Sequence, residues 1–529
     1  MKSFESLPPV IGGGNEKLDD LKRFDARTRK VLELSMELCR HETVSVPQKC
    51  TDYISIYDCA DVVRRFCMEN NLRIIELPID DEHPSPVMIV TFEEEGEVVM
   101  KSDLALMGHL DVVPAQDENQ FEPKIEGDFL FGRGTADMKT VVASQLVWMA
   151  EQQEKECPKP PFITMISFTE ENGDRNKNGM LDAINFMRDK LGVVGERTNE
   201  VELDSDVNRE KFNTICDANR AVHHLKASAG KKLTGIEAMR VFKDVMKTGR
   251  EIALRNNANI SSDRMERQKS WRTSFSNPFL QIAANGEFDI QTGSKLITLE
   301  RKGKSKHTAE VDVEDQTTAE IFWDIIESAR QKFGENVQLY DLEIGKVNSF
   351  NTVSADGKMN LIIDSERDEI REWISAVMET NENLEDDSTI TVIKDNWDLS
   401  LGLDTSLFGL DIREIPEHLE DISELIEDLR KQMQESGGDL AIEIEANGWI
   451  CPSDNPHLQK IISAYRCFHG KEPVLEGKPH ANDGRLVPGG NAIVLGQSGH
   501  NPHGPEEAHY IPSIIKWLEM MDVVAKKCI

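Results

Sequence analysis

Apolar positions in the first part of the chain follow two spacings. Between residues 31 and 38 and again between 142 and 149, apolar side chains recur every three or four positions, which indicates helices. The runs 104–108 (LALMG) and 162–169 (FITMISFT) are almost continuously apolar, which is typical of strands buried on both faces. Strand, helix and strand at this spacing predict an α/β domain whose sheet is mainly parallel and covered by helices on both faces.

The pattern changes from about residue 283. Segments 359–378 and 408–429 each begin with an apolar, strand-like run and continue with apolar residues at helical spacing. We therefore predict an inserted α/β sandwich domain over 283–447. The first domain would then consist of 1–282 and 448–529.

Length and composition narrow the class of protein. A chain of 529 residues is too long for one ordinary core, and 39% hydrophobic with 29% charged residues suits a soluble globular protein. The formal net charge of −34 would repel phosphate backbones and anionic lipid, so neither nucleic acid nor membrane is an expected partner. Nine scattered cysteines without a CxxC pair, no apolar leader and no apolar run of membrane-spanning length favour a cytoplasmic location.

One stretch departs from the acidic character of the chain. Residues 231–272 hold eleven Lys and Arg against five Asp and Glu. We interpret this stretch as an exposed basic insertion, with a binding surface for an acidic partner as the alternative.

Candidate metal ligands follow the predicted strands or lie in polar turns. They are His109 in GHLDVVP, Asp137 in GRGTADMK, the pair Glu170 and Glu171 in TEENGD, Asp217 in ICDANR, and His503 in NPHGPEE. Each alone could be a solvated surface residue, and Asp137 could cap the following helix. Together, two imidazoles and three carboxylates suit two divalent metals bridged by one aspartate.

The adjacent glutamates and Asp111 complete this hypothesis. Two neighbouring carboxylates repel each other in a buried pocket unless a cation or a proton lies between them. One glutamate would bind metal and the other would take a proton from the attacking water that bridges the metals. Asp111, two residues after His109, would hold that imidazole by its other ring nitrogen.

These motifs occur in an order that resembles a known family. GHLDVVP, GRGTADMK, TEENGD, ICDANR, GKSKHTAE, DIREIP, NDGRLV and HGPEE follow one another from about residue 109 onward. The chain is similar to the binuclear metallopeptidases and deacylases of peptidase family M20, which include carboxypeptidase G2, succinyl-diaminopimelate desuccinylase, acetylornithine deacetylase and carnosinase-type dipeptidases.

The resemblance implies a role for each matching residue. One metal would be held by His109, Asp137 and Asp217, and the other by Asp137, Glu171 and His503. Glu170 would be the general base and acid, and Asp111 would support His109. The implied substrate-contacting residues are His307 as oxyanion donor, Arg413 as carboxylate clamp, and Asn351, Asp483 and Arg485 near the substrate.

Two departures from the family pattern bear on these assignments. The interval between Glu171 and Asp217 is longer than usual and contains Asp204 and Asp206, which are alternatives to Asp217 as the fifth ligand. The resemblance implies that 283–447 is a lid or dimerisation domain and that 1–282 with 448–529 is the catalytic domain. The insert contains two strand-helix repeats where simpler members have one, which resembles dipeptidases whose lid closes on its own chain.

The resemblance implies a metallo-hydrolase that cleaves an amide bond next to a carboxylate, as a dipeptidase or exopeptidase. An N-acyl-amino-acid or N-succinyl deacylase is the alternative within this chemistry, and a non-catalytic binding protein is the alternative outside it. Two divalent metals are expected, with zinc favoured over cobalt and manganese. The expected substrate is a small dipeptide or N-acyl amino acid, and the chain would act as a monomer or homodimer.

Overall fold

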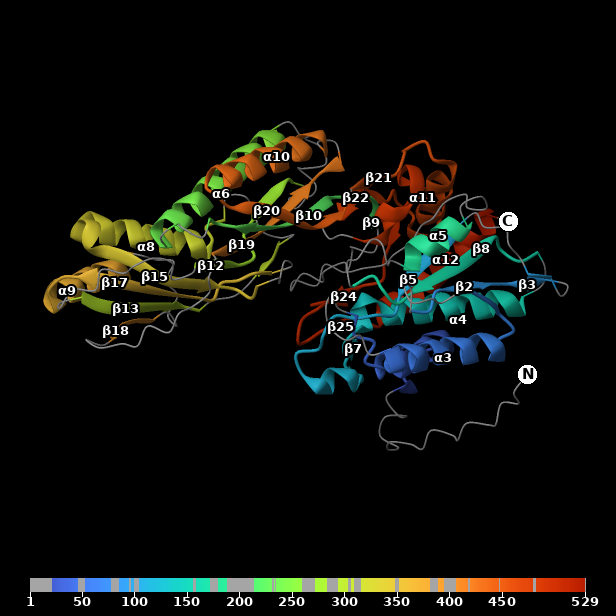
Figure 1. Ribbon diagram of the computed structural model, residues 1–529. Coiled ribbons are helices and arrows are strands. Elements are labelled where there is room, and N and C mark those ends of the chain that lie inside the picture. Colours follow the sequence, from blue (N-terminus) through green and yellow to red (C-terminus); the bar gives the residue numbers. More distant parts are fainter. Residues whose placement is uncertain are drawn as a thin grey trace. The chain divides into compact units, whose positions relative to one another are not determined.

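The computed structural model in Figure 1 describes most of the chain. The described residues are 21–45, 53–77, 85–94, 97–98, 104–155, 158–171, 179–187, 214–230, 233, 235–258, 272–282, 294–302, 306–308, 315–347, 352–380, 389–393, 406–416, 419–446, 448–478 and 482–528. They fall into two compact units. The first comprises Met1–Asp217, Ile450–Leu475 and Asn482–Ile529, and the second comprises Ala218–Trp449 and Glu476–Ala481.

The second unit begins well before the predicted boundary at 283. Strand β10 (Ala221–Ser228) pairs along its whole length with β19 (Leu407–Glu414) and also with β20 (Asp439–Ala446). Residues 221–228 therefore belong to the sheet of the second unit. They precede residue 283, where the apolar pattern of the sequence first indicated the inserted domain. The main segment of this unit ends at Trp449, and Glu476–Ala481, which lie beyond the predicted boundary at 447, also belong to the unit.

A four-stranded sheet forms the centre of the first unit. Its order is β1 (Arg73–Glu76), β2 (Met88–Thr91), β8 (Phe162–Ser167) and β5 (Leu104–His109). The β5–β8 pair is parallel, but β1–β2 and β2–β8 are antiparallel. This sheet is mixed, so the expected mainly parallel arrangement is not confirmed. An apolar run indicates that a strand is buried, but it carries no information on strand direction.

The predicted strand-helix-strand unit is confirmed, with α4 (Thr140–Glu154) between β5 and β8. Almost every residue of α4 is buried, and Trp148 packs edge-on against Phe162 with ring centroids 5.2 Å apart. The further helices of this unit are α2 (Ala26–Cys39), α3 (Tyr53–Glu69), α5 (Gly179–Met187), α11 (Pro456–His469) and α12 (Pro512–Cys528). Arg27 on α2 donates to Glu151 on α4 and to Asp522 on α12, each over 3.0 Å.

Smaller sheets and turns complete the first unit. One sheet has the order β24 (Gly499–His500), β25 (Ala508–Tyr510), β7 (Phe129–Phe131) and β6 (Lys124–Glu126). Another joins β21 (Trp449–Ile450), β9 (Thr214–Asn219), β22 (Val474–Lys478) and β23 (Val494–Leu495), where the chain crosses between units. The remaining elements are β3 (Glu93–Glu94), β4 (Glu97–Val98), η1 (Glu118–Phe121), η2 (Thr135–Lys139), η8 (Asp483–Leu486) and η9 (Pro488–Gly490).

The second unit is an antiparallel sheet with helices packed on it. The strand order is β18 (Thr389–Ile393), β13 (Ser294–Arg301), β17 (Gly357–Asp364), β15 (Val337–Ile344), β12 (Leu280–Ile282), β19, β10 and β20, and β11 (Ser274–Ser276) also pairs with β19. The helices are α6 (Gly235–Ala258), α8 (Thr318–Phe333), α9 (Arg367–Thr380) and α10 (Leu419–Glu435). A short η6 (Gly334–Asn336) follows α8, and β14 (Lys306–His307) pairs with β16 (Thr352–Val353). The two predicted strand-helix repeats are present as β17–α9 and β19–α10.

The basic stretch is in large part a structural helix. Residues 235–258 form α6, which buries Phe242, Val245 and Met246 in the core of the second unit. The interpretation of 231–272 as an exposed insertion is therefore wrong for 235–258, because the apolar stripe of the helix faces the sheet. Residues 259–271 lie outside the described residues.

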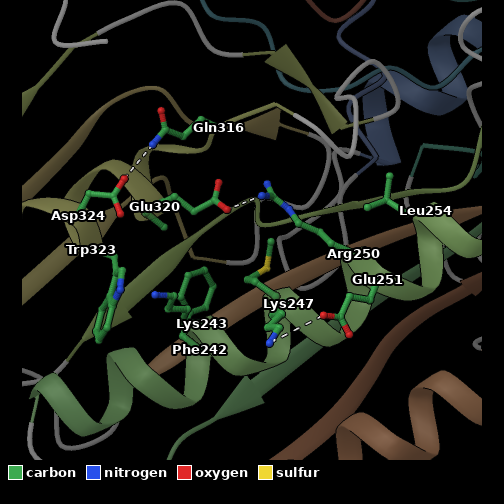
Figure 2. A pocket seen from close by; sticks show the side chains of 12 residues that line it. Phe242, Lys243, Lys247, Arg250, Glu251, Leu254, Gln316, Glu320, Trp323 and Asp324 are labelled. Carbon is green, nitrogen blue, oxygen red and sulfur yellow. Dashed lines mark hydrogen bonds and ion pairs between the residues drawn. The ribbon is translucent and has the colours of Figure 1, made fainter. Parts of the chain in front are cut away.

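A cavity of about 450 Å³ lies between α6 and α8, and Figure 2 shows its lining side chains. The cations in it have partners. Arg250 is ion-paired with Glu320, Lys247 lies 3.9 Å from Glu251, and the Lys243 ammonium lies 4.9 Å from the Trp323 ring centroid. This charge balance gives no support to the alternative of a surface for an acidic partner.

Among the described helices, none combines the length and the apolar character that a membrane span requires.

Candidate active site

The candidate site begins at the carboxyl ends of the parallel strands β5 and β8. His109 is the last residue of β5 and pairs with Ser167, the last residue of β8. Glu170 and Glu171 follow β8 directly, so all three functional side chains emerge at one edge of the sheet. The His109 Nε2 atom lies 3.9 Å from the Glu170 Oε2 atom. Ligands are expected at this edge of α/β sheets.

Asp111 is fully buried and contacts both strand ends. The His109 Nδ1 atom lies 3.0 Å from the Asp111 backbone oxygen and 3.3 Å from its Oδ1 atom. The Asp111 carboxylate also accepts hydrogen bonds from the backbone N–H groups of Glu170 (3.1 Å) and Glu171 (2.8 Å). These bonds orient the imidazole and anchor the paired glutamates. The sequence suggested only the contact with His109.

Asp137 lies in the irregular turn η2, just before α4. Gly134 in this turn has a φ of 78°, and a Cβ atom there would meet the Val112 Cγ1 atom at 2.8 Å. Glycine is required because a side chain would be both strained and crowded. The helix α4 has Lys139 at its N-cap, without a side-chain capping bond. The alternative that Asp137 caps this helix is therefore wrong.

His503 lies in the turn between β24 and β25. Its φ of 61° is unusual for a residue with a side chain, and such backbone strain clusters at functional sites. The Nε2 atom lies 3.1 Å from the Glu171 Oε1 atom and 3.5 Å from the Asp137 Oδ2 atom. The pairing of Ala508 with Phe131 holds this turn beside the one that carries Asp137.

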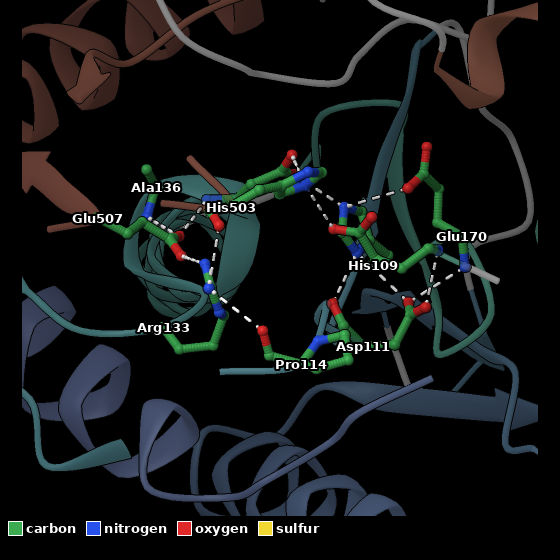
Figure 3. Close-up of polar contacts among 10 residues, drawn as sticks. His109, Asp111, Pro114, Arg133, Ala136, Glu170, His503 and Glu507 are labelled. Carbon is green, nitrogen blue, oxygen red and sulfur yellow. Dashed lines mark hydrogen bonds and ion pairs between the residues drawn. The ribbon is translucent and has the colours of Figure 1, made fainter. Parts of the chain in front are cut away.

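The polar atoms of these residues form two overlapping groups. His109, Glu170 and Glu171 make one group, and Asp137, Glu171 and His503 make the other, each with its ligand atoms within 4.8 Å of one another. Figure 3 shows His109, Glu170 and His503 with their hydrogen bonds and ion pairs. The second group contains the three residues expected around one metal. His109 connects to it through its Nε2 atom, 2.9 Å from the Asp137 Oδ1 atom.

Asp217 belongs to neither group among the residues described. It is buried in β9, and its backbone oxygen accepts a hydrogen bond from Cys451 N over 2.7 Å. The alternatives Asp204 and Asp206 lie outside the described residues.

The electrostatics of the second group favour a cation. Burial raises the pKa of the Glu171 carboxyl, and the carboxylates of Asp137 and Glu170 act in the same direction, while His503 opposes them. Burial acts to lower the pKa of His503, but Glu171 and Asp137 outweigh it and raise that pKa well above its usual value. The carboxylates around this imidazole thus favour a positive charge between them.

The residue types fit divalent metal binding. Imidazole nitrogens and carboxylate oxygens are the donors of zinc sites, and they also suit cobalt and manganese. A divalent ion would neutralise the crowded carboxylates better than one proton, because it contacts several of them at once.

The other predicted site residues fall in several places. Asp483 is buried and Arg485 is partly buried in η8, with the Arg485 Nη2 atom 3.9 Å from the Asp483 Oδ1 atom. In the second unit, Arg413 is buried in β19, where its Nε donates to Asp411 and its Nη2 donates to Thr308 over 3.0 Å. The backbone of His307 lies in β14. Asn351 lies outside the described residues.

Two residues of the site were missed from the sequence. Arg133 and Glu507 form a buried ion pair of 2.5 Å beside the turns that carry Asp137 and His503. Both residues lie inside motifs quoted above, GRGTADMK and HGPEE. Their ion pair could not be predicted, because the two motifs come together only through the pairing of β7 with β25.

Comparison with known proteins gives the family. The model for peptidase family M20/M25/M40 matches residues 105–527. The chain belongs to this family. It is thus a member of a family of metallo-hydrolases.

Individual relatives of this M20 protein are distant. A probable succinyl-diaminopimelate desuccinylase from Staphylococcus epidermidis is 31% identical over 104 residues, which are 18% of this chain and 26% of that protein. The chain thus spans only about a quarter of the length of this curated relative.

Two solved structures share the fold over nearly the whole chain. Human carnosine dipeptidase 1 has a TM-score of 0.55 at 11% identity and covers 97% of this chain and 99% of that one. The dipeptidase Dug1p of Saccharomyces cerevisiae has a TM-score of 0.53 at 12% identity and covers 97% of each chain. At such identities the likeness concerns the fold alone.

Replacing His503 tests the second ligand group. We expect His503→Ala to reduce the metal bound per chain, measured by elemental analysis after equilibration with zinc, because the group would lose its imidazole donor. His500→Ala is the matched control, since His500 is exposed in the same turn region. Equal metal content in the two variants would contradict the assignment of His503 as a ligand.

Proposed function

We propose that this M20 protein is a dipeptidase or related exopeptidase, which hydrolyses an amide bond next to a carboxylate of a small substrate. The observation that carries the proposal is the convergence of Glu170 with His109 and Glu171, next to the group of Asp137, Glu171 and His503. One carboxylate more than the second group uses is thereby placed where it could act as a base.

Two divalent ions, with zinc favoured over cobalt and manganese, are part of the proposal. One would be held by Asp137, Glu171 and His503, and the other by His109, Asp137 and Asp217. The first set is supported by the short distances between its ligand atoms, which lie within 4.8 Å of one another. The assignment of Asp217 as a ligand in the second set rests on the family resemblance. When bound, such ions lower the pKa of a water molecule and polarise a carbonyl group.

Glu170 is the proposed general base. Its carboxylate is 9% exposed and is held near His109 by the anchoring of its backbone N–H on Asp111. It accepts the proton of the attacking water and returns it to the amine that leaves, so one carboxylate serves both steps. Glu171, whose side chain faces His503, is the proposed metal ligand of the two glutamates.

Substrate binding is proposed for the residues that match the family's substrate contacts. Arg413 would bind the substrate carboxylate, because a guanidinium pairs with a carboxylate through two parallel hydrogen bonds. Asp411, whose pKa is lowered by Arg413 and His224 despite its burial, holds this guanidinium in place. The other proposed contacts are His307 for the oxyanion, and Asn351, Asp483 and Arg485 for the rest of the substrate.

The acyl group of the substrate separates two versions of the proposal. Dipeptidase activity is favoured by the two solved dipeptidases whose likeness in fold covers 97% of this chain. An N-acyl-amino-acid or N-succinyl deacylase is the second candidate, supported by the desuccinylase that matches 104 residues.

A substrate panel tests the proposal. With zinc, cobalt or manganese added, we expect hydrolysis of free dipeptides, and we expect amidation of their C-terminal carboxylate to raise KM strongly because the Arg413 clamp loses its partner. Product amines are quantified by chromatography. Cleavage of N-succinyl or N-acetyl amino acids in place of dipeptides would select the deacylase, and equal turnover of amidated substrates would refute the clamp.

Exchanging each glutamate for glutamine separates their roles. Glu170→Gln should retain metal and lose about 10²–10⁴-fold in kcat, the usual contribution of a general base. Glu171→Gln should lose metal, because it replaces a ligand that faces His503. Metal content and kcat are measured for both variants. The opposite pattern, with metal lost from Glu170→Gln alone, would reverse the assignment.

A further inference from the structure

Two buried charges adjoin the candidate metal ligands without belonging to either ligand group. Arg133 and Glu507 are each 1% exposed, and the Arg133 Nη1 atom lies 2.5 Å from the Glu507 Oε2 atom. Taking two charges out of water is costly unless further hydrogen bonds satisfy them. The hydrogen bonds that Arg133 and Glu507 make besides their ion pair therefore indicate the role of this buried pair.

The other carboxylate oxygen of Glu507 binds the backbone of the turn that carries Asp137. Its Oε1 atom accepts hydrogen bonds from the N–H groups of Ala136 (3.0 Å) and Asp137 (3.1 Å). Both carboxylate oxygens thus face donors. Glu507 fixes the peptide on which the candidate ligand Asp137 stands, and it is not itself available as a metal ligand.

Arg133 extends the same chain of bonds to the other turns. Its Nη2 atom donates to the backbone oxygen of His503 over 3.2 Å and to that of Pro114 over 3.4 Å. Figure 3 shows Arg133 between Glu507 and these carbonyl groups. One guanidinium therefore connects the turn of Asp137, the turn of His503 and the loop that follows Asp111.

We propose that Arg133 and Glu507 are positioning residues that set the spacing between Asp137 and His503 and thereby the affinity of the site for its metal. The inference rests on the proposed metal site. The mechanism needs no contact between the pair and the metal, because the pair holds the peptide units that carry two ligands.

The geometry dictates which substitutions are informative. Glu507→Gln keeps the size of the side chain but replaces one oxygen by an amide NH₂, which would face an N–H donor in either orientation. Arg133→Lys keeps the positive charge but loses the planar fork that reaches Glu507 and the two carbonyls together. Glu506→Gln is the matched control, because Glu506 is the exposed neighbour and loses the same charge.

A competition titration of zinc against a chromophoric chelator tests the proposal on the full chain. We expect Glu507→Gln and Arg133→Lys each to weaken zinc binding by about 10–100-fold, the usual effect of losing a group that orients a metal ligand. Glu506→Gln should bind as the unaltered chain does. The double variant should lose less zinc-binding free energy than the sum of the losses in the two single variants, because both residues act through one set of hydrogen bonds.

The outcomes are distinguishable. Circular dichroism and thermal unfolding of each metal-free variant establish that it is folded before titration, and if Glu507→Gln does not fold, Arg133→Lys decides. A folded variant of either residue with unaltered zinc affinity would overturn the positioning role. An unaltered chain that binds no zinc, cobalt or manganese would instead overturn the proposed function.

Discussion

Repulsion between buried carboxylates is the constraint on which the site depends. Asp137, Glu170 and Glu171 converge at the end of two parallel strands, where burial already raises the pKa of Glu171. A carboxylate taken out of water is unfavourable unless a cation or a proton compensates its charge. Hydrogen bonds from backbone N–H groups to Asp111 and Glu507 hold the converging turns in place, and a cation between the carboxylates would stabilise the arrangement.

The fold supplies this arrangement through two small pieces of structure. The parallel pair β5–β8 aligns His109 with the two glutamates, and the antiparallel pair β7–β25 brings Asp137 and His503 together from positions far apart in the sequence. The first piece depends on apolar strands buried beneath α4. The second depends on glycines in the turn before Asp137 and on a buried ion pair.

Several elements of the fold and most candidate ligands could be predicted from the sequence. The other features could not, for physical reasons. Helical and strand periodicity located α4, β5 and β8. Residue chemistry offered His109, Asp137, the pair Glu170 and Glu171, Asp217 and His503 as candidate ligands, and the family resemblance assigned Glu171 to the metal. Strand direction was not predictable, because β2 is apolar whichever way it runs. The role of α6 was missed since its basic face hid the buried stripe around Phe242, and the Arg133–Glu507 pair joins residues whose contact exists only after folding.

The most direct test of the central claim is metal dependence of hydrolysis. The full chain is stripped of metal with a chelator until elemental analysis detects none, assayed on dipeptides and N-acyl amino acids, and assayed again after addition of zinc, cobalt or manganese. The account predicts that activity disappears with the metal and returns with it. Full turnover by the metal-free protein would contradict the account.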